Sequence, residues 1–301
     1  MPRWMRWAAL VIVIIAAAYY WFFVESHVPA SGSYSLDIGE IRRLANSIPG
    51  TKPHSIHVEQ VATFTFPAAA IMAGESWNNE TAPAVSYQIV YPGRTVIVDT
   101  AMDEKITTAL GRATFHPEPY ARMTRAMAAA SLIVITHEHP DHIGGLTAYP
   151  DPASLIPAVR LTREQADHPD RMAPAVFPAG VLDQFKVVDY DRYYAAAPGI
   201  VLVKAPGHSP GSQMVFVQKD DGAEFLMLGD VAWQIRNVEN VRERPRFLST
   251  FMLREDRDAV MRELAELHRL QLAEPKLHML AGHDGKPIAA LEEQGLLIDG
   301  F

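Results

Sequence analysis

The pattern of apolar and polar positions divides this chain into an N-terminal hydrophobic run and a longer region in which strand and helix periods alternate. Short apolar or alternating stretches predict strands, and apolar residues three or four positions apart predict helices. The predicted strands are 61–66, 86–91, 94–99, 132–135, 185–190, 200–204, 213–218 and 225–228, with a short strand and helix at 160–166 and further helices at 120–130, 256–272 and 288–293. Strand-rich halves with intervening helices favour an α/β protein built as a four-layer αβ/βα sandwich.

The N-terminal run, residues 7–24, is long enough to cross a membrane. Its 18 apolar residues would span about 27 Å as a helix, close to the hydrocarbon thickness of a bilayer. Arg3 and Arg6 precede the run and aromatic residues 19–21 lie near its end, as expected for a cytoplasmic start and an interfacial far end. We therefore expect residues 1–24 to be a transmembrane signal-anchor in a bacterial-type inner membrane, with an extracytoplasmic (periplasmic) domain. A signal peptide cleaved near Val28-Pro29-Ala30, giving a secreted protein, is the alternative.

The remainder of the chain is expected to consist of a connecting arm and one folded domain. Residues 25–57 predict a tether, flexible around Ser31-Gly32-Ser33, with one short helix near 36–48. Residues 58–301 are expected to form a single domain. The sequence carries no signal for the oligomeric state.

Composition narrows the class of protein. The chain has 301 residues, of which 49% are hydrophobic and 21% charged, so a packed core is expected. A formal net charge of −8 argues against nucleic acid as a partner. There is no cysteine, which excludes disulfides and cysteine-type metal sites and is compatible with an oxidising compartment.

A dense cluster of histidines directly follows the predicted strand 132–135. The next ten residues read THEHPDHIGG, which places His137, His139, Asp141 and His142 at the carboxyl end of that strand. Open α/β sheets bind ligands at this edge, and imidazole and carboxylate groups are ligands of zinc and similar divalent metals. A zincin helix is excluded because aspartate stands where His-Glu-x-x-His needs its second histidine. The two glycines after the cluster are expected to permit a tight backbone turn.

The motif His-x-His-x-Asp-His, with a strand before it and Gly-Gly after it, resembles the metal motif of the metallo-β-lactamase superfamily. Four more parts of that pattern occur in this chain and cover roughly residues 58–285. Val96 to Thr100 matches an early strand that ends in Asp99, and Pro206 to Ser212 resembles the loop with the third histidine of the first metal site. Leu228 to Asp230 resembles the strand end with the bridging aspartate. Ala281 to His283 resembles the segment with the last histidine, a ligand of the second metal.

The resemblance implies two divalent metal ions held by seven side chains. The first site would take His137, His139 and His208, the second would take Asp141, His142 and His283, and Asp230 would bridge them. Zinc is the default, and iron, manganese or cobalt suit the same ligands. Ions ~3.5–4 Å apart would lower the pKa of a bridging water from 15.7 to around 7, giving a hydroxide that attacks a carbonyl or phosphoryl centre. Asp141 and Asp230 are the expected catalytic residues, with Asp99 and Thr136 holding ligand imidazoles in place.

The same resemblance narrows the substrate of the expected enzyme. The ligand set is similar to those of N-acyl homoserine lactonases, hydroxyacylglutathione thioesterases, tRNA-processing ribonucleases and phosphodiesterases. Export disfavours the thioesterases, and the acidic charge disfavours the ribonucleases. We therefore expect a hydrolase that acts on a small-molecule lactone or other carboxylic ester. The alternatives are a phosphodiesterase, favoured if arginines of the 231–253 connection converge on the metals, a thioesterase, a β-lactamase-like amidase, or a metal-binding module without catalysis.

Three features concern the substrate side of the expected site. The lactonases tend to have tyrosine three residues after the bridging aspartate, where this chain has Trp233, whose indole donates one hydrogen bond but is not a phenol. Residues 67–84 are expected to form a long loop over the site. Its Ile71, Met72 and Trp77 would either contact an acyl chain or pack inward. The 231–253 connection is expected to be either a substrate wall or a solvated crossover.

Overall fold

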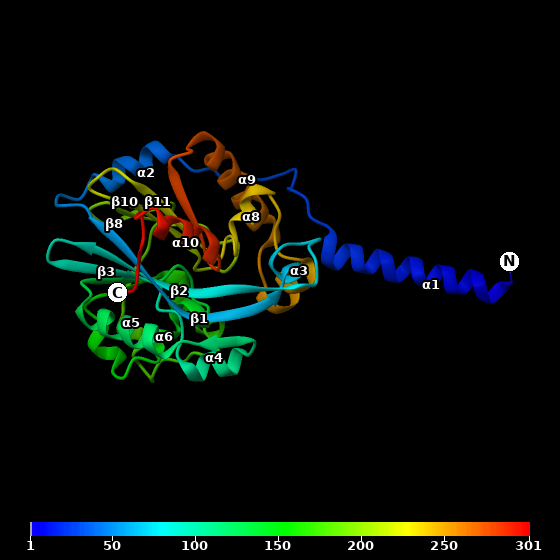
Figure 1. The fold of residues 1–301 in the computed structure, drawn as a ribbon, viewed down its shortest axis with the longest axis horizontal. Helices are drawn as coiled ribbons and strands as arrows, with labels where there is room; N and C mark the ends of the chain where they lie inside the picture. The colour runs from blue at the N-terminus through cyan, green and yellow to red at the C-terminus, as the bar shows by residue number, and fades with distance from the viewer. Residues whose placement is uncertain (1) are drawn as a thin grey trace.

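The computed structural model describes residues 2–301 and shows two β-sheets packed face to face with helices outside (Figure 1). The larger sheet runs, in order, β13 (Ile298–Asp299), β1 (Ser55–Pro67), β2 (Asn79–Tyr91), β3 (Arg94–Val98), β5 (Leu132–Val134), β6 (Val159–Thr162) and β7 (Lys186–Val188), with β4 (Ala113–Phe115) paired to β1. The smaller sheet runs β12 (Leu277–Ala281), β11 (Glu224–Gly229), β10 (Gln213–Gln218), β9 (Ile200–Lys204) and β8 (Tyr193–Ala197).

The helices cover the outer faces of these sheets. The larger sheet carries α4 (Glu104–Leu110), α5 (Pro117–Ala129) and α6 (Pro140–Thr147), and the smaller sheet carries α2 (Ile38–Ala45), α8 (Ile235–Glu239) and α9 (Arg257–Ala273). The other short helices are α3 (Ala68–Ile71), α7 (Arg163–Asp167), α10 (Gly285–Glu293), the 3₁₀ turns η2 (Pro152–Leu155), η3 (Pro169–Arg171) and η4 (Leu182–Gln184), and the π-helical segment η5 (Leu248–Leu253).

Three separate groups of buried apolar side chains fill the three spaces between four layers. Met123 of α5 is buried in the group that contains Ile133 of β5, and Leu264 of α9 in the group that contains Phe216 of β10. The third group lies between the sheets and brings residues of β2 and β3 together with residues of β9 to β11. The predicted four-layer αβ/βα sandwich is therefore confirmed.

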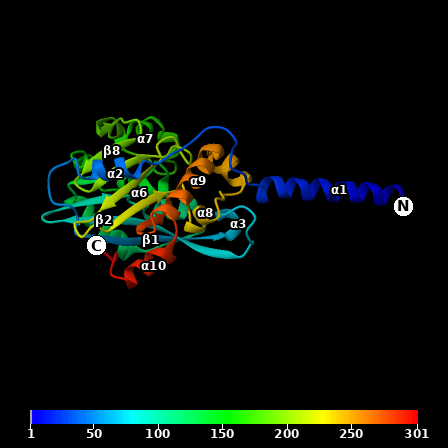
Figure 2. The same cartoon turned by 90° about the horizontal axis from the view of Figure 1, so that it is seen from above.

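The N-terminal helix α1 (Arg3–Tyr19) continues into the π-helical turn η1 (Tyr20–Val24) and projects away from the body of the molecule (Figures 1 and 2). The combined helix has 22 residues, and its most apolar 18-residue window has a mean hydropathy of 2.2 and no buried residue. Its length and composition suit a membrane span, and an N-terminal signal sequence meets the same two conditions.

The structure differs from expectation in two connecting regions. Strand β1 starts at Ser55, inside the expected tether, because Ile56 and Val58 alternate with polar residues and fill the space between the sheets. The expected long loop 67–84 is wrong, since α3 begins just after Pro67 and β2 begins at Asn79. The domain boundaries after residues 24 and 57 stay predictions.

The two glycines after the histidine cluster do not form the expected turn. They allow close packing of a helix instead. Gly144 and Gly145 lie inside helix α6. A β-carbon at Gly144 would lie 3.0 Å from the carbonyl oxygen of Ala101, and one at Gly145 would overlap the carbonyl oxygen of Thr100. The missing side chains therefore let α6 lie directly on the segment that follows β3, which fixes where the helix start points.

Candidate metal centre

The seven residues expected to bind metal lie together at one end of the two sheets. Their positions follow from the ends of four strands and the start of one helix. His137 follows β5, His139 caps the start of α6 with Asp141 and His142 in its first turn, His208 lies between β9 and β10, Asp230 directly follows β11, and His283 follows β12. Three different layers of the sandwich thus contribute to one centre.

Strand register explains why two of these residues meet although they are far apart in sequence. Strands β11 and β12 are parallel, with Gly229 opposite Ala281. Beyond the strands, the backbone N–H of His283 donates to the carbonyl oxygen of Trp233 at 2.9 Å. As a result, Oδ1 of Asp230 lies 3.2 Å from Nε2 of His283.

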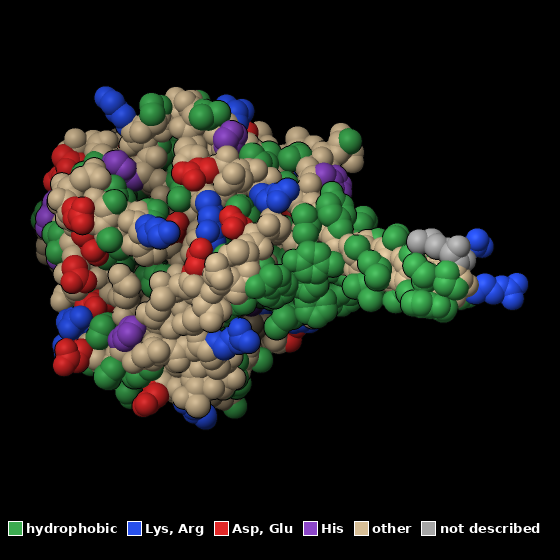
Figure 3. Space-filling view, turned by 45° about the vertical axis from the view of Figure 1, so that its right-hand side comes forward, with side chains coloured by type: hydrophobic (Ala, Val, Ile, Leu, Met, Phe, Trp, Pro, Cys, Tyr) green, Lys and Arg blue, Asp and Glu red, His purple; other side chains and the backbone are tan. Residues whose placement is uncertain are grey.

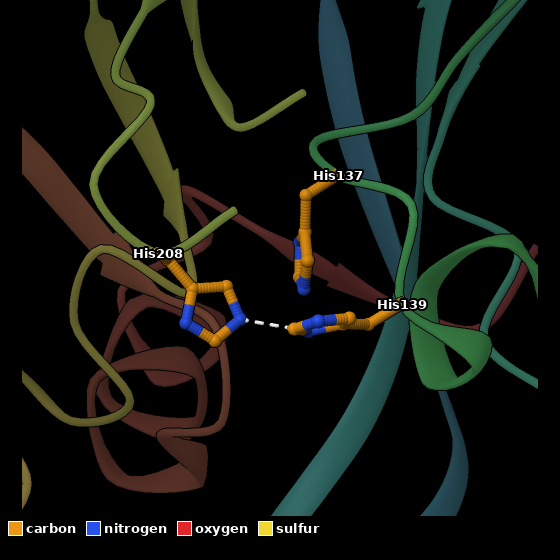
Figure 4. Close-up of side chains that lie close together, drawn as sticks. All are labelled: His137, His139 and His208. Atoms are coloured by element: carbon orange, nitrogen blue, oxygen red, sulfur yellow. Dashed lines mark hydrogen bonds between the residues drawn. The ribbon is translucent and has the colours of Figure 1, made fainter. Parts of the chain in front are cut away.

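The first group of candidate ligands consists of His137, His139 and His208, whose rings converge on one point (Figure 4). Nε2 of His208 lies 2.9 Å from Nδ1 of His139. Nε2 of His137 is buried and has no hydrogen-bond partner within residues 2–301. One nitrogen from each ring lies within 4.8 Å of the other two, so the three can reach a common cation.

The second group consists of Asp141, His142 and His283. Oδ2 of Asp141 lies 3.4 Å from Nε2 of His283 and 3.9 Å from Nε2 of His142. Asp230 lies between the two groups, because its Oδ1 is 3.2 Å from Nε2 of His142 and its Oδ2 is 3.4 Å from Nε2 of His208. One carboxylate thus faces both groups at once.

Burial and neighbouring charges shift the pKa values of the residues in the centre in different directions. Burial, reinforced by the nearby His142 and His208 rings, holds the pKa of His137 well below its ordinary value, so this ring keeps a free lone pair. Burial alone would lower the pKa of His142, but the carboxylates of Asp230 and Asp99 raise it well above that value. Burial likewise opposes ionisation of Asp230, yet His283 and His142 hold its pKa well below the usual range.

The donor set fits divalent cations. Nε2 of His137, Nε2 of His142 and Oδ1 of Asp230 are all buried without a hydrogen-bond partner in the described chain. Leaving such atoms unsatisfied is costly, and each unsatisfied buried polar group calls for an explanation. Imidazole nitrogens and carboxylate oxygens facing one another at 3–4 Å are what zinc and similar ions require.

Asp99 supports the centre from below, as expected from its place at the end of β3. Its carboxylate accepts hydrogen bonds from the backbone N–H of Thr136 at 2.6 Å and from the Thr136 hydroxyl at 2.8 Å, and it lies 2.8 Å from Nδ1 of His142. Asp99 has a φ of 60°, a strained value for a non-glycine residue that these bonds help to hold. The contact with Nδ1 leaves Nε2 of His142 directed into the centre.

Sequence reasoning missed Glu255, which orients the third histidine of the first group. Oε1 of Glu255 lies 2.6 Å from Nδ1 of His208 and accepts a hydrogen bond from Nε of Arg244 at 2.8 Å. All three side chains are almost completely buried. Glu255 follows the centre's aspartate by 25 positions and precedes helix α9 without a motif of its own, so only the folded chain reveals the contact.

A cavity of about 530 Å³ opens onto the centre. The three ligands that reach it are His139, Asp141 and Asp230. Its apolar lining is Phe64, Phe66, Leu110, Pro140, Ala173, Trp233, Leu248, Met252 and Leu253, and its charged lining beyond the ligands is Arg112, Asp170, Arg171 and Arg254. The 231–253 connection therefore forms a wall of the cavity, as one of the two expected alternatives stated.

The residues of the shortened 67–84 region do not line this cavity. Ile71 is buried in the fold, whereas Trp77 is exposed and contacts the N-terminal helix through a hydrogen bond from its Nε1 to the hydroxyl of Tyr19 at 3.0 Å. Packing inward, one of the two expected alternatives, is therefore correct for Ile71. For Trp77 neither alternative is correct.

The fold and the site together define an αβ/βα-sandwich protein with a candidate two-cation centre at its strand ends. Residues 81–271 match the family model described as the metallo-beta-lactamase superfamily, and the chain belongs to this superfamily. The expectation drawn from the five motifs is thereby confirmed.

Curated relatives similar to this chain include N-acyl homoserine lactonases. N-acyl homoserine lactonase AiiA of Bacillus thuringiensis subsp. kurstaki is 29% identical over 109 residues, 36% of this chain and 41% of the relative. An N-acyl homoserine lactonase from a Bacillus species is 25% identical over 138 residues, 46% of this chain and 49% of the relative. The matched segments thus span less than half the length of these relatives.

Two solved structures share the fold at low identity. An N-acyl homoserine lactone hydrolase with N-hexanoyl-L-homoserine at its catalytic metal centre superposes with a TM-score of 0.60 and 16% identity, covering 80% of this chain and 97% of that one. AidC, a dizinc quorum-quenching lactonase, gives a TM-score of 0.56 and 14% identity, covering 80% and 91%.

Proposed function

We propose that this protein is a dinuclear metal-dependent hydrolase that opens lactones or related carboxylic esters carrying an apolar chain. The observation that carries the proposal is the convergence of seven candidate ligands, three of which line a largely apolar cavity. The lactonases among the relatives and solved structures support the choice of substrate class.

In this proposal His137, His139 and His208 would hold one cation, Asp141, His142 and His283 would hold the second, and Asp230 would contribute to both sites. Two such ions, zinc by default, would supply Lewis acidity and an activated water. The protein's own contribution is to fix the ligand atoms by burial and by second contacts such as those of Asp99 and Glu255.

Asp141 is the side chain best placed to handle a proton during the reaction. It is partly exposed and lines the cavity, whereas His142, His208 and His283 are buried. A carboxylate at this position would orient the attacking water and transfer its proton to the departing alkoxide of an opened lactone.

The cavity wall suits an acyl chain better than a phosphodiester. Phe66 stacks on Trp233 with ring centroids 5.4 Å apart, and Leu248 and Met252 complete an apolar side. None of the arginines of the 231–253 connection lines the cavity, and each has another partner: Arg236 pairs with Glu80, Arg242 donates to the carbonyl oxygen of Ala73, Arg244 pairs with Glu255 and Arg246 pairs with Glu25.

We further propose that α1 and η1 anchor the enzyme in a membrane, with the catalytic domain on the extracytoplasmic side. The length and hydropathy of the helix, the absence of fully buried residues along it and the arginines at its start support an uncleaved anchor.

A hydrolysis panel tests the proposed activity. Metal-loaded protein and Asp230→Ala would be assayed side by side on acyl lactones, β-lactams, thioesters and phosphodiesters, with the metal content of both measured. We expect wild type to open acyl lactones and the variant to lose bound metal and lose at least a hundredfold in kcat/KM. Turnover of the phosphodiester alone would contradict the ester assignment.

A further inference from the structure

The surface around the end of the N-terminal helix carries four exposed apolar side chains that the proposed reaction does not use as a group. Trp77, Phe247, Phe251 and Met252 are 55%, 44%, 63% and 66% exposed, and we call these four residues the collar. Figure 3 shows hydrophobic side chains gathered where the helix joins the body, continuous with those of the helix itself. Apolar patches of this kind are uncommon on soluble surfaces and mark interaction sites.

The collar packs directly against the last turns of the helix. The rings of Phe247 and Phe251 lie 6.5 Å and 6.1 Å from that of Phe22, and Trp77 lies 5.4 Å from Phe23. Nε1 of Trp77 also donates a hydrogen bond to the hydroxyl of Tyr19 at 3.0 Å. Since Tyr19 precedes the end of η1 by five residues, Trp77 reaches back about 7 Å along the helix axis.

The junction between helix and body is fixed by polar contacts as well. The backbone N–H of Gly74 donates to the carbonyl oxygen of Phe23 at 2.8 Å. Arg246 pairs with Glu25, the first residue after η1, and its guanidinium lies 4.0 Å from the ring centre of Trp21. Because these contacts attach the end of the helix directly to the body, the depth at which the helix lies in a bilayer also determines the depth of the collar.

The collar is continuous with the cavity through the segment η5 (Leu248–Leu253). Leu248, Met252 and Leu253 line the cavity, while Phe251 in the same segment contacts the helix end. Residues 247–253 include no charged side chain, although 21% of the whole chain is charged. A short uncharged segment thus has one side on the catalytic cavity and the other beside the membrane anchor.

From this arrangement we propose that the collar is a membrane-docking surface, inserted at the boundary between lipid headgroups and acyl chains, that holds the cavity mouth against the bilayer. Aromatic side chains are favoured at that depth, and their neighbours on a rigidly attached helix must share it. Substrates with long acyl chains then enter the cavity from the lipid phase, a consequence that rests on the proposed ester hydrolase activity.

The natural absence of cysteine makes the docking testable with single fluorescent labels. The full-length protein would carry Phe251→Cys, Ile14→Cys or Leu272→Cys and be reconstituted in phosphatidylethanolamine/phosphatidylglycerol vesicles containing lipids with a nitroxide near the headgroup or deep in the chain. Leu272 is the matched control, since it is 71% exposed and lies near the far end of α9, 15 positions and ~22 Å from the helix start beside η5.

We expect the label at 251 to lose about half of its fluorescence to the shallow nitroxide, the label at 14 to be quenched by the deep one, and the label at 272 to be unaffected. Quenching at 14 together with a label at 251 that behaves like the control would overturn the collar proposal and leave the anchor intact. A label at 14 outside the lipid would overturn both. A label at 251 shielded from lipid and from water alike would indicate a second copy of the chain there, which also contradicts the proposal.

A kinetic measurement separates docking from the chemistry. Phe251→Asp, whose side chain lies outside the cavity lining, should raise KM severalfold for a long-chain acyl lactone in vesicles and leave a short, water-soluble lactone unaffected. Equal loss on both substrates would contradict docking. Failure of both enzymes to open any lactone would contradict the proposed activity while leaving the quenching result to decide the collar.

Discussion

Nε1 of Trp233 donates a hydrogen bond to Oδ2 of Asp230 across 2.7 Å. The indole is held in this orientation by Phe66, on which it stacks. Oδ1 of the same carboxylate remains free of hydrogen bonds and faces His142 and His283. The tryptophan therefore directs the aspartate that lies between the two candidate metal groups and, with its single donor occupied, is not available to bind a substrate polar group.

Removing this hydrogen-bond donor should weaken metal binding while an aromatic side chain remains in the cavity wall. We expect Trp233→Phe to bind metal about 10–100-fold more weakly, because partners that orient metal ligands typically contribute that much. Competition with a chromophoric chelator measures the affinity. Trp77→Phe is the matched control, since Trp77 is exposed and outside the cavity, and unchanged affinity in both variants would contradict the role given to the indole.

The carboxylate of Asp99 cannot be replaced by an amide without cost. Asn at this position keeps one acceptor for Thr136 but presents N–H donors where Nδ1 of His142 needs an acceptor. Asp99→Asn should therefore lose about 10–100-fold in metal affinity. Asp103→Asn, the same change at the half-buried cap of α4, should keep full affinity because either residue caps a helix. Equal behaviour of the two variants would be inconsistent with this account.

Close packing of α6 predicts a strong effect of a single methyl group. Gly145→Ala would overlap the carbonyl oxygen of Thr100, which belongs to backbone and cannot move aside. We expect an unfolding free energy lower by about 1–3 kcal/mol or more, as for overpacked cores, and a lower Tm. Gly285→Ala in α10 meets only Pro83 at 3.6 Å and should be neutral or slightly stabilising. Thermal unfolding of both variants decides the matter.

Glu263 is buried beside the loop that carries His208, and it should make the stability of the protein depend on pH. Glu263 accepts a hydrogen bond from the backbone N–H of Gly207 at 3.0 Å, and burial raises its pKa to about 8 from 4.5. Because the pKa of the folded state is the higher one, the stabilisation is complete below pH 4.5 and is lost as pH rises through about 8. The slope in between is at most about 1.4 kcal/mol per pH unit.

Glu263→Gln removes this titration while keeping an acceptor for Gly207. Denaturant unfolding of both proteins between pH 5 and about 9 should show the wild type losing stability relative to the variant as pH rises. Parallel stability curves would show that Glu263 does not titrate in this range.

Most of the centre could be predicted from the sequence because the motifs that carry the family resemblance are short and local. The histidine cluster after the buried run 132–135 and the later segments LGD and AGH can be read from the sequence, whereas the parallel pairing of β11 and β12 that brings Asp230 and His283 together is seen only in the structure. Local patterns also predicted α9, whose stripe Val260, Leu264 and Leu267 is buried and whose cap is Asp256.

Other features depend on long-range packing and left little local trace. Strand β8 reads YYAAA, and alanine favours helices, so it was missed although it pairs with β9 at the edge of the sheet. The contact of Glu255 with His208 arises only when α9 covers the smaller sheet. The position of Trp77 against Tyr19 depends on how the N-terminal helix joins the body.

X-ray diffraction at the absorption edge of the bound metal tests the central claim most directly, because it locates cations without reference to activity. The account predicts two anomalous peaks about 3.5–4 Å apart. One would contact His137, His139 and His208, the other Asp141, His142 and His283, and both would touch Asp230. A metal-loaded crystal with a single peak, or with peaks away from Asp230, would contradict it.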